Sequence, residues 1–197
     1  MRAPTAQPAT TQPVERILGV YEGQRPGRTV VVIGGMHGNE PAGIMAARSV
    51  LAQLRSRGID MAGKLVGVAG NLQAIAIDQR YMERDLNRGW TVDSCRRVND
   101  PDAQAQLRPE DVEQRGLLDV FRPLEAESAE PLAFLDLHST SGPAAPFSII
   151  PDVARNRDLA LSLPIPTVLG LEEILEGVMF GYLVDRGHMG VAVEGGQ

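Results

Sequence analysis

Short apolar runs alternate with longer helix-like segments through the first part of the chain. Residues 30–33 and 64–69 are apolar and rich in valine, and they predict strands that are buried on both faces. Between them, residues 41–57 carry apolar side chains at helical spacing, with a proline at the start and Gly58 directly after the end. This alternation predicts an α/β fold with a largely parallel sheet.

The same alternation continues to the C-terminal end. We expect further strands at residues 14–21, 131–138, 147–150 and 189–194, and further helices at residues 110–121 and 153–163; residues 167–171 are short and apolar. In the helix at 110–121, the side chains expected to face the core are Val112, Leu117, Leu118 and Phe121. Three segments are predicted to be irregular: a turn at 23–27, a polar segment at 71–88 and a long polar excursion at 89–109. The expected architecture is three-layered αβα, with a largely parallel or mixed central sheet.

Composition and charge narrow the class of protein. The 197 residues allow one fairly large domain, expected at residues 14–197, after a disordered lead-in at residues 1–13. The lead-in lacks the apolar stretch of a signal peptide, and no apolar run is long enough to span a membrane. A net charge of −6 argues against general nucleic-acid binding. The single cysteine, Cys95, excludes an internal disulfide and favours a cytoplasmic protein; we assign it no role.

Candidate catalytic side chains lie where three of the predicted strands end. His37 and Glu40 form an H-x-x-E pattern after the strand at 30–33, His138 ends the strand at 131–138, and Glu194 ends the last strand. Parallel neighbours would bring these ends together on one rim of the sheet. Two histidines and one carboxylate are a common set of catalytic zinc ligands that leaves a position for water. Glu194 is then the natural group to move the proton of that water, and Asp136 is a candidate to fix the tautomer of His138.

Four motifs in this order, GGMHGNE, RYMERDLNR, DLHST and VEGG, resemble the succinylglutamate desuccinylase and aspartoacylase family, a relative of the zinc carboxypeptidases. The resemblance extends from about residue 29 to residue 197. It implies a zinc-carboxypeptidase-like fold and hydrolysis of the amide bond in an N-acyl amino acid. It also implies one zinc ion per chain, bound by His37, Glu40 and His138, with Glu194 as general base and later general acid.

The resemblance also assigns roles to the arginine-rich segment. Asn87 and Arg88 of DLNR match residues that bind a substrate carboxylate, and Arg80 matches the arginine that polarises the scissile carbonyl. These roles suit arginine, because its planar fork binds carboxylates and its fixed charge stabilises an oxyanion. Asp85 of the same motif is placed with Asp136 among the residues that support the metal ligands.

The chain departs from the family pattern in two places. The family normally continues past the glutamate with a β-rich C-terminal domain that covers the site, whereas this chain stops three residues after Glu194. We therefore expect a fragment that has low activity and an exposed surface that allows homo-oligomers. A further carboxylate-binding arginine of the family has no aligned counterpart, since Arg186 is out of register.

Two other functions stay open at this point. One is a zinc carboxypeptidase that removes a C-terminal residue from peptides, although DLNR favours a small substrate. The other is a non-catalytic metal-binding module. Glu83, Arg84 and His188 are expected to be exposed residues with no part in the site.

Overall fold

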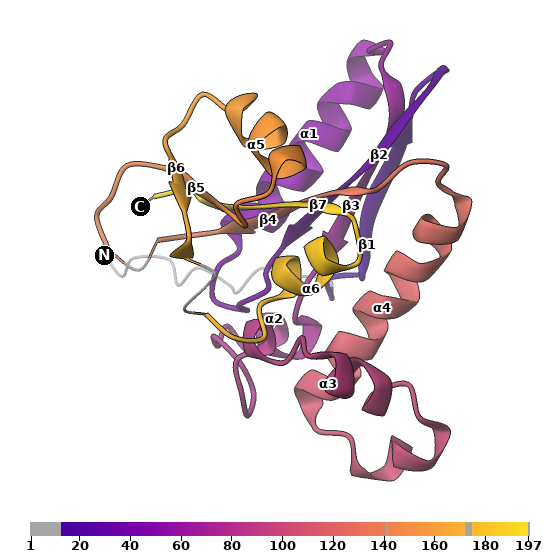
Figure 1. The fold of residues 1–197 in the computed structure, drawn as a ribbon, viewed down its shortest axis with the longest axis vertical. Coiled ribbons are helices and arrows are strands. Elements are labelled where there is room, and N and C mark those ends of the chain that lie inside the picture. Colours follow the sequence, from indigo (N-terminus) through magenta and orange to yellow (C-terminus); the bar gives the residue numbers. More distant parts are fainter. Residues whose placement is uncertain (1–12, 141, 172–174, 197) are drawn as a thin grey trace, which may run out of the picture.

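The computed structural model describes residues 13–140, 142–171 and 175–196, so nearly all of the predicted lead-in lies outside the described residues. These residues form a seven-stranded sheet with the strand order β1-β3-β2-β4-β7-β5-β6 (Figure 1). The strands are β1 (Ile17–Glu22), β2 (Arg25–Gly34), β3 (Ala62–Ala69), β4 (Ala133–His138), β5 (Phe147–Ile150), β6 (Thr167–Leu169) and β7 (Met189–Glu194).

The four strands in the middle of the sheet, β3, β2, β4 and β7, run parallel to one another. The outer strands are mixed, because β1 is antiparallel to β3 and β5 is antiparallel to β7. The prediction of an α/β fold with a largely parallel or mixed sheet is therefore confirmed. Since β2, β4 and β7 are adjacent and parallel, their carboxyl ends lie on the same rim.

Helices cover both faces of the sheet, as a three-layer αβα fold requires. Figure 1 shows α1 and α5 on one face and α4 and α6 on the other. The helical elements are α1 (Ala42–Arg57), α2 (Leu72–Ala76), η1 (Leu86–Arg88), α3 (Val92–Arg97), η2 (Pro101–Gln106), α4 (Pro109–Glu127), α5 (Ala154–Leu161) and α6 (Met179–Asp185).

Side chains alternate across the sheet and so divide the core in two. Phe134 of β4 packs in the main cluster with Phe121 of α4 and Leu183 of α6. The next residue, Leu135, packs on the opposite face in a cluster with Ala160 of α5. Each fully buried large apolar side chain contributes roughly 1.5–3 kcal/mol, so the larger cluster under α4 and α6 is the main source of hydrophobic stabilisation.

The start of β2 differs from the prediction. Residues 23–27 were predicted as a turn, but β2 begins at Arg25, which is in register with Ala62 of β3. The ladder is irregular between Arg25 and Thr29, where Pro26 and Gly27 lie. Proline lacks the N–H that a regular ladder needs. The proline and glycine therefore mark an irregularity within the strand rather than a turn before it.

The segment 89–109 is also more ordered than predicted. It contains α3 and η2, and Trp90, Cys95 and Val98 belong to the main core cluster. Thr91 caps α3, since its Oγ1 accepts a hydrogen bond from the Ser94 N–H at 3.1 Å. The apolar residues here are few and widely spaced, so their pattern did not indicate a helix. The short helix α6 was missed as well.

Charged side chains in the first turns of α4 are buried against the rest of the protein. Val112, expected to be buried, is 40% exposed, whereas Glu110, Asp111 and Glu113 are buried. This part of the prediction is wrong because the carboxylates have partners that the apolar pattern does not reveal. Arg84, expected to be a free surface residue, is one of these partners, since its guanidinium contacts the Asp111 carboxylate.

His188 is buried, in contrast to the prediction that it is exposed. Its Nδ1 accepts the backbone N–H of Leu132 at 3.2 Å, and its Nε2 lies 2.9 Å from Glu125 Oε1. His188 therefore joins the starts of β4 and β7 to the C-terminal part of α4. Arg186, which has no aligned family counterpart, contacts the same glutamate at 3.1 Å.

Asp111 is expected to stabilise the fold in a pH-dependent way. Burial opposes its ionisation, but the bidentate contact from Arg97 at 2.7 and 2.9 Å and the Arg108 N–H outweigh burial and lower its pKa. Because the pKa of Asp111 is lower in the folded protein, the ionised carboxylate stabilises the fold above the ordinary aspartate pKa. This stabilisation is lost as the pH falls through the pKa that Asp111 has in the folded protein.

We expect Asp111→Asn to lower the free energy of unfolding at pH 7 by about 1–3 kcal/mol. The difference between variant and wild type should shrink below about pH 4, where an unfolded aspartate becomes protonated. Urea denaturation at several pH values measures both effects. A difference that stays constant down to pH 3 would contradict the role of the Asp111 charge.

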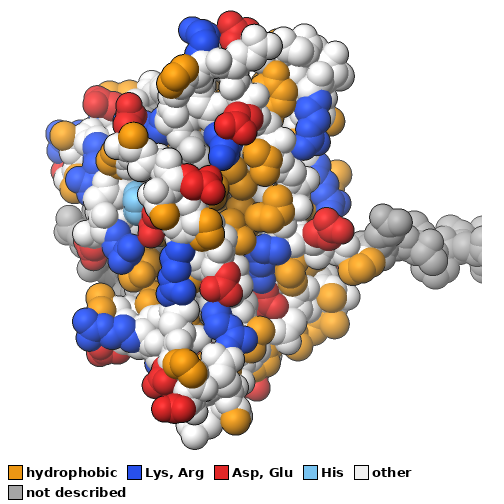
Figure 2. Space-filling view, turned by 90° about the vertical axis from the view of Figure 1, so that its right-hand side faces the viewer, with side chains coloured by type: hydrophobic (Ala, Val, Ile, Leu, Met, Phe, Trp, Pro, Cys, Tyr) orange, Lys and Arg blue, Asp and Glu red, His pale blue; other side chains and the backbone are white. Residues whose placement is uncertain are grey.

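Strand β1 forms one edge of the sheet. Its large side chains Ile17 and Val20 are 39% and 42% exposed, and Figure 2 shows hydrophobic side chains gathered on the side of the molecule that carries this edge. The Arg55 guanidinium donates to the Val20 carbonyl at 2.9 Å and so covers part of the edge. Self-association through exposed surface stays a prediction.

Within the described residues, no helix is long and apolar enough to cross a membrane.

Candidate metal centre

The loop after β2 is fixed by close backbone contacts. Gly34 packs on the backbone of Gly43, where a Cβ would lie 2.4 Å from a carbonyl carbon. Gly35 has a φ of 74°, which glycine adopts without strain. The loop then closes through a hydrogen bond from the Glu40 N–H to the His37 carbonyl at 3.1 Å. The GG-x-H pattern therefore holds His37 and Glu40 at the carboxyl end of β2.

Three of the predicted residues, His37, Glu40 and His138, meet in one buried cluster. One potential ligand atom from each lies within 4.8 Å of the others. The Nδ1 atom of His37 is 2.9 Å from Glu40 Oε1, and Nδ1 of His138 is 3.1 Å from Glu40 Oε2. Two imidazole nitrogens and a carboxylate that converge in this way form a donor set suited to a divalent metal ion.

The outer nitrogen of each imidazole faces a second carboxylate. The Nε2 atom of His37 is 3.2 Å from Asp85 Oδ1, and Nε2 of His138 is 3.0 Å from Asp136 Oδ2. Asp136 is buried, and its oxygens have no other hydrogen-bond partner among the described residues. Metal-binding histidines commonly carry such a carboxylate on the second nitrogen. The positions of Asp85 and Asp136 therefore fit the supporting role predicted for them.

The charges in the cluster are strongly coupled. Burial lowers the pKa of His138, but Asp136 and Glu40 outweigh burial and hold that pKa well above its ordinary value. The pKa of His37 is raised in the same way, against burial, by Asp85 and Glu40. Burial opposes ionisation of Glu40, yet its contacts with both imidazoles hold its pKa far below the usual range. The carboxylates thus favour positive charge at this position, which a metal cation would also supply.

Arg80 lies at the edge of the cluster. Its Nη1 is 3.2 Å from Glu40 Oε1 and its Nη2 is 3.4 Å from Asp85 Oδ2. The side chain is 41% exposed, so part of the guanidinium faces solvent beside the candidate ligands. The guanidinium is therefore accessible to a molecule that binds next to the cluster.

Asn87 and Arg88 lie in η1, which follows directly. The Asn87 carboxamide is buried, and its Oδ1 accepts the Met179 N–H at 2.9 Å. The Asn87 N–H donates to Asp85 Oδ1 at 2.9 Å, and Arg88 Nη1 donates to the Asn87 carbonyl at 2.7 Å. The segment is therefore held in place by its own hydrogen bonds and by the start of α6.

Glu194 ends β7 beside His138. The two residues are in register on neighbouring parallel strands, so their side chains point to the same face of the sheet. Gly195 continues the pairing, since its N–H donates to the His138 carbonyl at 2.9 Å. The Glu194 side chain is half-buried and has no hydrogen bond or ion pair with the residues that the structure describes.

Glu110 is a residue of this region that the sequence pattern did not indicate. Its side chain is fully buried, and it accepts the backbone N–H groups of Met82 at 2.7 Å, Glu83 at 3.2 Å and Arg84 at 3.4 Å. These residues lie between Arg80 and Asp85. The only signal in the sequence was a cluster of acidic residues at the start of a helix, which more often lies in solvent.

We expect Glu110→Gln to loosen the segment between Arg80 and Asp85. The neutral side chain keeps one acceptor oxygen but loses the charge that strengthens these hydrogen bonds, each worth roughly 1.5–3 kcal/mol. Hydrogen exchange at the amides of residues 82–84 should accelerate about tenfold or more, since tenfold corresponds to about 1.4 kcal/mol. Glu83→Gln, an exposed glutamate in the same segment, is the matched control. Equal exchange in wild type and Glu110→Gln would contradict this role.

The fold and the buried His–Glu–His cluster define an α/β protein with a candidate metal centre. The family model "Succinylglutamate desuccinylase/Aspartoacylase catalytic domain" matches residues 26–175, so the chain belongs to this family. A probable aspartoacylase from Prochlorococcus marinus (strain MIT 9313) is 32% identical over 175 residues, which cover 85% of this chain and 53% of that relative.

Solved structures support the fold assignment. The succinylglutamate desuccinylase from Chromobacterium violaceum has a TM-score of 0.67 at 21% identity, covering 86% of this chain and 53% of that one. Murine aminoacylase 3 has a TM-score of 0.60 at 24% identity, covering 89% of this chain and 57% of that one. The chain spans about half the length of these relatives.

Proposed function

We propose that the protein is a zinc-dependent hydrolase that cleaves the amide bond of an N-acyl amino acid. The observation that carries the proposal is the cluster of His37, Glu40 and His138, in which both imidazoles also face a buried or partly buried carboxylate. Membership of the succinylglutamate desuccinylase and aspartoacylase family supports the reaction class.

Zinc would be bound by the Nδ1 atoms of the two histidines and by the Glu40 carboxylate, the atoms that converge in the cluster. A zinc ion in such a site lowers the pKa of a bound water and polarises a carbonyl. Asp85 and Asp136 would hold the imidazoles in the orientation and tautomer that present Nδ1 to the metal. These five ligating and supporting residues come from three separate parts of the chain.

The other residues would carry the proton and position the substrate. Glu194 has a side chain without a partner among the described residues, so it is free to take a proton from the attacking water and return it to the leaving amine. Arg80 would stabilise negative charge that develops on the carbonyl oxygen. Arg88, beside Asn87, would bind the carboxylate of the amino acid.

The test is a hydrolysis assay on zinc-loaded protein with the N-acetyl and N-succinyl derivatives of aspartate and glutamate. The release of a free amino group from at least one of them is expected. Hydrolysis of only C-terminal residues from peptides would overturn the N-acyl amino acid assignment in favour of a carboxypeptidase. Zinc binding without turnover of either class would favour a non-catalytic metal-binding module.

A further inference from the structure

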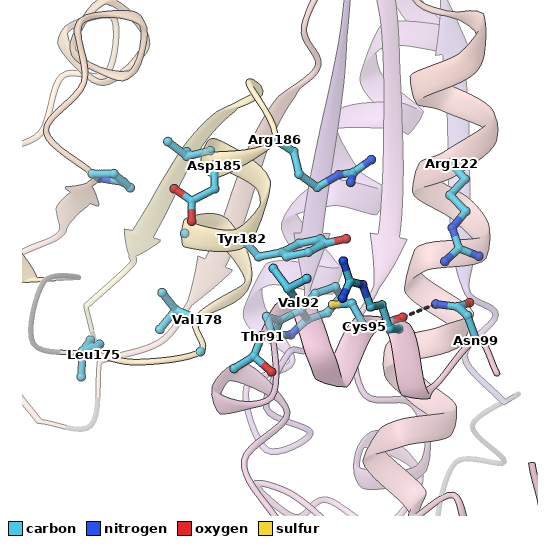
Figure 3. A pocket seen from close by; sticks show the side chains of 16 residues that line it. Thr91, Val92, Cys95, Asn99, Arg122, Leu175, Val178, Tyr182, Asp185 and Arg186 are labelled. Atoms are coloured by element: carbon cyan, nitrogen blue, oxygen red, sulfur yellow. Dashed lines mark hydrogen bonds between the residues drawn. The ribbon is translucent and has the colours of Figure 1, made fainter. Parts of the chain in front are cut away.

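A cavity that does not include the candidate metal ligands lies between α3, α6 and the C-terminal half of α4 (Figure 3). Its volume is about 880 Å³, within the range of sites for small organic molecules. None of His37, Glu40 and His138 lines it. This cavity therefore has a lining that is separate from the proposed metal ligands.

Three arginines from three elements line this cavity. Arg96 belongs to α3, Arg122 to α4, and Arg186 follows the end of α6. Figure 3 shows Arg186 and Arg122 on either side of the space next to the Tyr182 ring, with Cys95 below them. Burial raises the pKa of the Cys95 thiol, while Arg186 and Arg122 act in the opposite direction, as cations near the thiol must. The Arg186 and Arg122 guanidiniums thus lie near the same thiol, and Arg96 lines the same cavity.

The acidic residues nearby leave part of this positive charge unpaired. Arg186 contacts Glu125 at 3.1 Å, and Arg122 reaches Asp119 only at 3.8 Å with both side chains about half exposed. Such an exposed, long contact contributes little. Arg96 forms no ion pair with any residue in the described part of the chain. Asp185 also lines the cavity, but Figure 3 shows its carboxylate on the side of α6 away from Arg122.

We propose that this cavity binds a small organic anion with two or more carboxylate or phosphate groups. Among the described residues, Arg96 forms no ion pair and Arg122 only the exposed 3.8 Å contact with Asp119, and both side chains carry planar donor groups that suit carboxylates and phosphates. Apolar side chains such as Val92 and Val178 line the rest of the space and match the carbon part of such a ligand. The volume is far larger than an inorganic anion needs, which favours an organic ligand.

The walls of the cavity are bonded to the proposed substrate-binding segment. The Trp90 N–H donates to the Gly177 carbonyl at 2.9 Å, and Met179, next to Val178, donates to Asn87 Oδ1. A ligand in the cavity would therefore contact Val178, the neighbour of the residue that donates to Asn87. Binding itself does not depend on the reaction at the metal centre.

The fluorescence of Trp90 tests the proposal directly. It is the only tryptophan of the chain, it lines the cavity and it is 3% exposed. Succinate, tricarballylate and fructose 1,6-bisphosphate are titrated at constant ionic strength, with acetate as a monoanion. We expect a saturable change with at least one polyanion and none with acetate. No saturable change with any of the three polyanions would overturn the proposal.

Variants locate the binding. The double variant Arg96→Gln/Arg122→Gln should weaken the titrated affinity about tenfold or more, with thermal melting to confirm that it is folded. Arg57→Gln, an exposed arginine at the end of α1 on the other face of the sheet, should bind as wild type does. Arg80→Gln should also leave binding unchanged, which separates this cavity from the metal centre. An unchanged affinity in the double variant, or a loss only in Arg80→Gln, would overturn the proposal.

Discussion

Replacing Glu194 with glutamine is expected to lower kcat by about 10²–10⁴-fold, the usual contribution of a general base, while zinc stays bound. Glutamine has the same shape as glutamate but cannot accept the proton of the attacking water. The fold should not change, because the Glu194 side chain has no hydrogen bond or ion pair with described residues and its strand pairs through the backbone. Steady-state kinetics on the best N-acyl amino acid, together with zinc analysis, measure both parts of the prediction.

The matched control for this variant is Glu83→Gln, which removes an exposed carboxylate near the same rim and should leave kcat unchanged. Full activity in Glu194→Gln would remove Glu194 from the mechanism. Loss of zinc together with activity would show instead that Glu194 contributes to metal binding.

Replacing Arg80 with glutamine is expected to lower kcat by about 10²–10³-fold, as the loss of an oxyanion-stabilising donor does elsewhere. Arg80 lies beside Glu40 at 3.2 Å and is partly open to solvent, so a bound carbonyl can reach it. The variant should keep its zinc, because the two histidines and Glu40 remain. Kinetics with saturating substrate separate the effect on kcat from the effect on KM.

Arg48→Gln serves as the control for Arg80, since Arg48 is an exposed arginine of α1. A rise in KM with unchanged kcat would assign Arg80 to substrate binding alone. A loss of zinc in Arg80→Gln would mean that the arginine acts by holding Glu40.

The convergence of the candidate ligands was predictable because each of them follows or ends a short apolar run in the sequence. Residues 30–33, 131–138 and 189–194 are short, largely apolar runs, and His37, His138 and Glu194 lie at or shortly after their ends. Their short length and flanking glycine and polar residues favour buried strands. Once β2, β4 and β7 are parallel neighbours, His37, His138 and Glu194 must share a rim. The resemblance of the motifs to the family also predicted Asp85 as a supporting residue. Asp85 contacts His37, which lies 48 positions earlier in the chain.

The parts that escaped prediction depend on partners that no apolar pattern contains. Glu110 is buried because it accepts hydrogen bonds from backbone N–H groups of residues 82–84. Every residue except proline has a backbone N–H, so the sequence does not indicate which of them meets a buried carboxylate. His188 was expected to be exposed because it precedes the strand, yet it is buried between a backbone N–H and Glu125. A few separated residues of the segment 89–109, including Trp90, pack in the core. They do not recur at helical spacing, so their pattern did not predict a helix.

The central claim is that His37, Glu40 and His138 bind a zinc ion, and metal content tests it most directly. Elemental analysis of protein purified without added metal should find about one zinc ion per chain, as in other sites with three protein ligands. The zinc should be lost in His138→Ala and reduced in His37→Ala. Protein that contains no metal and takes up none when zinc is added, or an unchanged zinc content in both variants, would contradict the account.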